Sequence, residues 1–196
     1  MIDMLTEADK QALERAVRVA DQMCSAYAKL RDACAARALI LDLVVLLVST
    51  WLVAMTFVEP ALGRKLSPPG IDREIWIGLL SVGVFFAALV QLRVDWKSKA
   101  DRYQRALLAY SAFLRGNRRH RAASSTVSHE VVQNALANYR TIGDWVEPIP
   151  EKCFLGLKKH HKVKIEISRH LDGHPSTSIW LLRVRLWWRD NCRRRS

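Results

Sequence analysis

Two long apolar stretches in the first half of the chain constrain its fold more than any other feature. Residues 38–58 contain one charged residue, Asp42, and residues 75–92 contain none. About 20 apolar residues in a helix span the hydrocarbon core of a bilayer, whereas a helix of a small soluble protein would carry a polar stripe. The pattern therefore predicts an all-α membrane protein with a two-transmembrane helical hairpin. The alternative is a soluble bundle in which these segments are the central helices.

The segment before the hairpin is predicted to be a cytosolic amphipathic helix. Within residues 1–37, apolar side chains recur at three- and four-residue spacing from Leu13 to Cys34, which is the helical period. This helix is predicted to cover residues 5–36 and to run straight into the first span. The hairpin itself occupies residues 38–95, and Pro68-Pro69-Gly70 breaks its connecting loop.

Residues 96–196 are predicted to form a basic cytosolic helical domain and tail. An amphipathic helix at 96–115 has a second apolar seam, which could pair with the first seam within one chain or between subunits. We expect a basic loop at 116–125 and a helix from 128 to 142 that ends at Gly143.

The last two segments follow a second proline break. Residues 151–171 are predicted to be helical, with Phe154, Leu157, His161 and Ile165 on one face. The tail at 179–188 fits either a strand or a basic interfacial helix, and the pattern does not decide between them.

Charge is distributed very unevenly along the chain. Residues 1–95 carry a net charge of −1, and residues 96–196 carry +13. Exporting such a basic domain against the membrane potential is costly, so both termini are expected in the cytosol. A basic domain favours an anionic partner such as lipid headgroups or a nucleotide, while stacking aromatics between basic residues occur only at 180–189, which disfavours nucleic acid.

Polar side chains within the predicted spans are candidates for a pore. Asp42 lies about one turn inside the cytosolic end, where an unpaired carboxylate is costly, and Arg93 emerges at the same end of the second span. The pair could gate a pore, or it could only fix the register of the hairpin. The other candidates are hydroxyls and an acidic residue at the outer mouth: Ser49, Thr50, Thr56 and Glu59.

Basic clusters in the cytosolic part are candidates for contact with anions or lipids. They comprise Arg118, Arg119, Arg121, Lys158, Lys159, Lys162, Lys164 and Arg169. No glycine-rich phosphate loop accompanies them, and a solvated basic helix is the alternative. The sequence shows no nucleophile–base pair, no paired carboxylates and no zinc-like spacing of its four cysteines, so we expect no enzyme, no cofactor and no metal.

Two segments of the chain resemble a known family. The aromatic and leucine-rich helix at 103–114, together with Pro150-Glu151-Lys152-Cys153-Phe154-x-x-Leu157-Lys158-x-x-His161-x-x-Lys164-x-x-x-Ser168-Arg169, is similar to the SLATT domain. The resemblance implies a two-transmembrane effector of bacterial conflict systems that assembles in the inner membrane and makes it leak. It also implies a trigger, which would be a nucleotide second messenger or a sensor protein.

The sequence therefore predicts a non-enzymatic effector that forms homo-oligomers in the bacterial inner membrane and permeabilises it on a cytosolic signal during anti-phage defence. The alternative is a membrane-anchored scaffold or adaptor that recruits a cytosolic partner.

Overall fold

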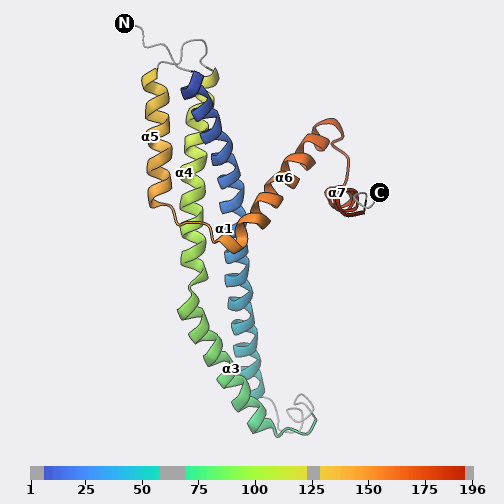
Figure 1. The fold of residues 1–196 in the computed structure, drawn as a ribbon. Coiled ribbons are helices and arrows are strands. Elements are labelled where there is room, and N and C mark those ends of the chain that lie inside the picture. The colour runs from blue at the N-terminus through green and yellow to red at the C-terminus, as the bar shows by residue number, and fades with distance from the viewer. Residues whose placement is uncertain (1–6, 58–68, 123–128, 193–196) are drawn as a thin grey trace. The chain divides into compact units, whose positions relative to one another are not determined.

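The described part of the chain is all-α, with its helices joined by short non-helical connections. The computed structural model describes residues 7–57, 69–122 and 129–192, and the side chains of all of these except 119–122. Within these ranges the chain forms α1 (Glu7–Phe57), α3 (Arg73–Val94), α4 (Trp96–Ala122), α5 (His129–Trp145), α6 (Glu151–Gly173) and α7 (Ile179–Cys192), with no strand (Figure 1). The all-α prediction is confirmed, and the tail, which the sequence left open, is a helix.

The chain divides into two compact units, and α1 and α4 each contribute to both. The central unit is Leu30–Gln104, and the terminal unit combines Met1–Lys29 with Arg105–Ser196. The predicted passage of the first amphipathic helix into the apolar stretch is confirmed, because α1 is one continuous helix of 51 residues.

In the central unit, the second half of α1 and α3 lie side by side and antiparallel (Figure 1). At one end, Arg73 donates a hydrogen bond to the carbonyl oxygen of Met55. At the other end, Gln91 donates to Asp42. A further bond between the Arg31 guanidinium and Gln104 joins α1 to α4, at 2.8 Å.

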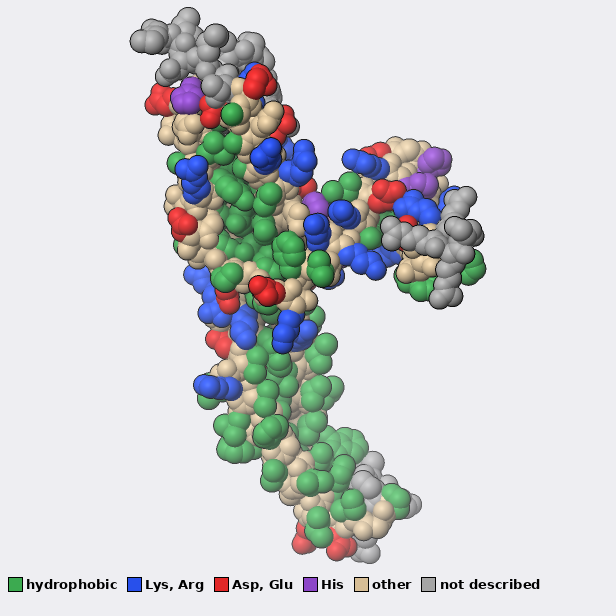
Figure 2. All heavy atoms as spheres, in the orientation of Figure 1, with side chains coloured by type: hydrophobic (Ala, Val, Ile, Leu, Met, Phe, Trp, Pro, Cys, Tyr) green, Lys and Arg blue, Asp and Glu red, His purple; other side chains and the backbone are tan. Residues whose placement is uncertain are grey.

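The two apolar helices leave most of their apolar side chains uncovered. By length and composition, α1 and the segment Arg73–Arg118 could each cross a membrane. Leu47 on α1 is 67% exposed and Phe86 on α3 is 66% exposed. Figure 2 shows hydrophobic side chains covering the visible face of this unit. The core helix of a soluble protein would bury such side chains.

The terminal unit has an aromatic core between α1, α4 and α5. The rings of Tyr27 and Tyr110 stack with centroids 5.8 Å apart, and Tyr139 packs against both Tyr110 and Phe113. The Tyr27 hydroxyl also donates to the carbonyl oxygen of Glu147 at 2.9 Å, which ties the segment after α5 to α1. The seams of α1 and α4 therefore pair within the chain, which was one of the two arrangements that the sequence allowed.

Two expectations about glycine were wrong. α4 continues through Gly116 to Ala122, where a loop was predicted, and the buried side chain of Asn117 bonds back to the carbonyl of Phe113. α5 likewise passes Gly143 and ends at Trp145. A glycine inside a helix costs only about 1 kcal/mol relative to alanine, and tertiary contacts of neighbouring residues outweigh that cost.

The buried face of α6 differs from the predicted one. Leu157, His161 and Ile167 are buried, while Phe154 and Ile165 are exposed. In the structure α6 contacts α1 through His161 and also contacts α7, and Ile167 is buried in place of Phe154 and Ile165.

Candidate functional site

A polar cluster lies where the apolar part of α1 meets the end of α3. The Asp42 carboxylate accepts a hydrogen bond from the Gln91 amide at 2.6 Å and forms an ion pair with the Lys97 ammonium at 2.8 Å. The Asp42 side chain is 35% exposed and that of Lys97 65% exposed. The carboxylate thus has a donor on α3 and a cation on α4, which compensates for its position in an apolar helix.

Within the chain, the structure does not pair Asp42 with Arg93, and a coupling of the two between neighbouring subunits stays a prediction. Arg93 is two residues from Gln91 and therefore about 200° around the helix from it, so the two side chains cannot face the same neighbour. The cation that reaches Asp42 comes instead from Lys97, beyond the end of α3.

Asp95 makes this arrangement possible, because it joins α3 to α4 in a left-handed conformation with φ of 44°. Its backbone N–H bonds to the carbonyl of Gln91 at 3.2 Å and closes α3. Its side chain accepts from the backbone N–H of Ser98 at 3.1 Å and caps α4. Aspartate tolerates this backbone region better than most residues. The junction changes the direction of the chain and so brings Lys97 back toward α1.

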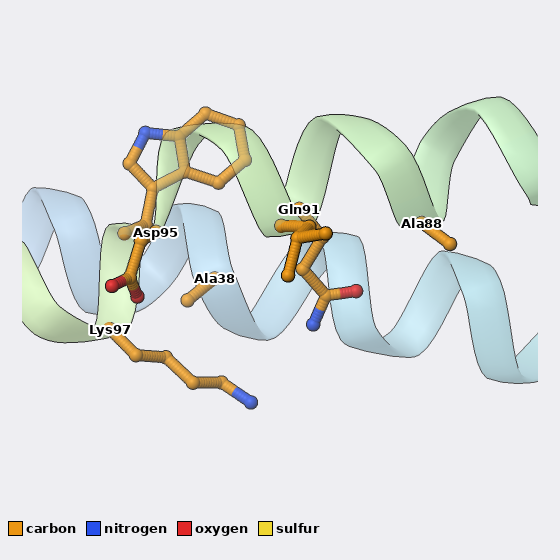
Figure 3. A pocket seen from close by; sticks show the side chains of 7 residues that line it. Ala38, Ala88, Gln91, Asp95 and Lys97 are labelled. Carbon is orange, nitrogen blue, oxygen red and sulfur yellow. The ribbon is translucent and has the colours of Figure 1, made fainter.

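A cleft of about 420 Å³ lies beside the cluster. Its lining combines small apolar side chains with polar ones: Ala38, Ala88, Gln91, Leu92, Asp95, Trp96 and Lys97. Figure 3 shows the Lys97 side chain extending toward the Gln91 amide, with Ala38 of α1 beside them. An apolar floor and a charged rim suit a molecule with a short apolar part and a polar head.

The other candidates in the spans have local roles. The hydroxyl of Thr50 donates to the carbonyl of Leu46 at 2.8 Å, and that of Thr56 donates to the carbonyls of Leu52 and Val53. Both hydroxyls are therefore satisfied within their own helix. Ser49 is half-buried, and Glu59 lies outside the described residues.

The basic candidates on α6 are all exposed: Lys158, Lys159, Lys162, Lys164 and Arg169. Arg118 is also exposed, near the end of α4, and the side chains of Arg119 and Arg121 lie outside the described part. Figure 2 shows several lysine and arginine side chains gathered along α6. This surface can attract anions, as the sequence predicts, but it has no preformed phosphate cradle.

Sequence reasoning missed one buried polar group that links α6 to α1. The Nδ1 atom of His161 lies 3.1 Å from the Ser25 hydroxyl, and its Nε2 atom lies 3.9 Å from the Asp21 carboxylate. The trio resembles a nucleophile, base and acid, but 3.9 Å is too long for a hydrogen bond and Ser25 is buried. The group is a structural link, and its members are too far apart in sequence for any local pattern to reveal it.

Burial also sets the protonation of two neighbouring groups. It raises the pKa of the Cys24 thiol to about 11, with a further contribution from Asp21. Burial, together with nearby cations such as Lys29 and Lys164, lowers the pKa of His160. The thiol is therefore protonated and weakly nucleophilic at neutral pH, and His160 is neutral.

Comparison of the chain with protein-family models, with curated proteins and with solved structures finds no match.

Proposed function

We propose that the protein is a non-enzymatic effector of the bacterial inner membrane that forms homo-oligomers and permeabilises the membrane on a cytosolic signal. In this proposal α1 and α3 cross the bilayer as a hairpin, and both termini lie in the cytosol. The SLATT-like segments supply the effector role, the anti-phage context and the candidate trigger, a nucleotide second messenger or a sensor protein.

The observation that carries the proposal is the exposed apolar surface of the central unit. Leu39, Phe57 and Leu92 are more than half exposed, as are many apolar neighbours along the same helices. Each square ångström of apolar surface left in water costs roughly 25 cal/mol. A bilayer removes that cost, and the Asp42–Lys97 ion pair lies at one end of the helix pair, where headgroup water can solvate it.

Assembly is required because two helices cannot enclose a channel. Gly83 and Ala87 form a small-xxx-small pair on α3, a pattern that lets membrane helices approach closely. Among the described residues, nothing lies within 4 Å of the position that a Gly83 side chain would take. Gly83 therefore leaves room for a neighbouring subunit to approach α3 closely.

The second candidate, a membrane-anchored scaffold, is favoured by the hydroxyls of α1. Thr50 and Thr56 bond to their own helix, so they offer little to an ion path. A plain anchor would have the same arrangement.

A swap of the spans separates the two candidates. Residues 38–58 and 75–92 would be replaced by an unrelated apolar hairpin, and membrane potential would be followed with a voltage-sensitive dye in expressing bacteria. We expect the native chain to depolarise the membrane and stop growth, and the swapped chain to insert without doing either. A swapped chain that still stops growth without depolarisation would reject the pore and favour the scaffold.

The trigger is tested separately on α6. Replacing Lys158, Lys159, Lys162 and Lys164 by glutamine should change the response to infection and leave insertion intact. Glutamine substitution at Arg140, an exposed basic residue of α5, is the matched control.

A further inference from the structure

α7 has an exposed apolar surface that the proposed function does not use. Leu182 is the buried residue of this helix, and it lies on the side of α7 that faces α6. An ion pair between Arg189 and Glu166, at 3.4 Å, holds the same side to α6. The opposite side carries large apolar side chains that are at least 40% exposed, and Trp188 among them also borders the cleft toward α6: Trp180, Leu181, Val184, Trp187 and Trp188.

These five residues, which we call the tryptophan face, form one continuous surface. At 100° per residue they fall within an arc of about 120°. They are 40–69% exposed, and Trp180 is the most exposed of them. Arg183 borders the arc on one side and Arg185 on the other, and no acidic residue lies within it.

This distribution fits one kind of occupant best. Tryptophan prefers the boundary between lipid headgroups and acyl chains. A helix that lies in this boundary has an apolar face with basic residues at its edges, where they meet lipid phosphates. The tryptophan face has both features, and both arginine borders match a negatively charged surface.

Two other occupants fit less well. Two copies of the face packed together would bring arginine borders of the same charge close to each other, which opposes association. A nucleic acid would stack on the tryptophans, but Leu181 and Val184 on the same arc provide hydrocarbon and no stacking surface.

We propose that the tryptophan face of α7 lies on the anionic cytosolic leaflet as an amphipathic helix. The protein would then contact the membrane at a second place, outside the two spans. This inference rests on the proposed function only in placing the chain at a membrane.

The test uses the full chain reconstituted in vesicles. Exposed Cys153 and Cys192 would be replaced by serine, and a fluorophore would be attached at Leu181→Cys on the face or at Asn134→Cys on α5 as the matched control. Lipids carrying a quencher at headgroup or acyl-chain depth would be included, in bilayers with one quarter phosphatidylglycerol or with phosphatidylcholine alone.

We expect strong quenching at position 181 by shallow quenchers in anionic bilayers, and at least threefold weaker quenching at position 134. Replacing Arg183 and Arg185 together by glutamine should reduce binding of the face by about 25-fold, because each basic residue near an anionic surface contributes about 1 kcal/mol. High salt should have a similar effect on the native chain.

Equal quenching at both positions would overturn the inference. Disulfide formation between copies of the unlabelled Leu181→Cys chain, with no lipid quenching of the labelled chain, would also overturn it, because it indicates a second copy. Release of the face by competing RNA would overturn it as well. Alkaline extraction is measured on the same vesicles. If the chain is extracted, the proposed function fails whatever position 181 reports; if the chain stays inserted and position 181 is not quenched, only this inference fails.

Discussion

The ion pair between Asp42 and Lys97 gives the most direct test of the central unit. The two charged groups are 2.8 Å apart, but Lys97 is 65% exposed, so solvent screens much of their attraction. Exposed pairs contribute about 0.2–1 kcal/mol, whereas removing one partner of a fully buried pair costs about 3–5 kcal/mol. With the carboxylate 35% exposed, we expect a coupling energy near the upper limit for exposed pairs, about 1 kcal/mol, or roughly fivefold in the unfolding equilibrium.

A double-mutant cycle measures this coupling. Asp42→Asn, Lys97→Met and the double variant would be unfolded reversibly in mixed micelles by increasing the fraction of dodecyl sulfate, with tryptophan fluorescence as the signal. The matched cycle uses Arg93→Met, since Arg93 is a basic residue at the same end of α3 whose side chain is not the one paired with Asp42 in the structure. A coupling near zero for Lys97, or a larger one for Arg93, would refute the assignment of partners.

Three further outcomes are expected. Tyr27→Phe should lower the unfolding free energy by about 1 kcal/mol, because it removes the hydrogen bond to the Glu147 carbonyl and keeps the ring stack; chemical denaturation measures this. The pKa of Cys24 is raised to about 11 in the folded chain, so the unfolded chain releases this proton first and stability should fall as the pH rises from 9 to 11. The fall should be smaller than the roughly 3 kcal/mol that two pKa units represent, because solvent screens the half-buried thiol, and a Cys24→Ala variant should lack that part of the pH dependence. Asp95→Ala should lower the free energy of unfolding by about 1 kcal/mol or more, because it removes the cap of α4 and leaves alanine in a left-handed conformation. Asp95→Gly should lower it only a little, because glycine adopts that conformation readily. Thermal unfolding of the two variants tests the difference.

Prediction from sequence succeeded where one local pattern determined the outcome. The apolar stretches at 38–58 and 75–92 predicted helices long enough to cross a membrane, and α1 contains the first as far as Phe57, the last described residue there, while α3 contains the second. The seams from Leu13 and from Trp96 predicted amphipathic helices, and one tyrosine from each, Tyr27 and Tyr110, stack in the core of the terminal unit. Each of these features depends on residues close together in the chain, so hydrophobic periodicity is sufficient to find it.

Prediction failed where a distant residue decided the outcome. Gly116 and Gly143 look like helix ends, but both lie within helices in the structure, because contacts made by the residues next to them outweigh the cost of a glycine. The tail became a helix because Leu182 could pack against α6, a contact that its mixed pattern could not reveal.

The candidate site shows the same division between sequence and tertiary structure. The sequence alone identified Asp42 as the one charged residue of the first apolar stretch, because a carboxylate there is costly wherever its partner lies. Only the tertiary structure chose that partner. The left-handed backbone of Asp95 redirects the chain and presents Lys97, instead of Arg93, to α1. Helix periodicity fixes the direction of a side chain within one helix, but the junction between two helices fixes which side chains meet.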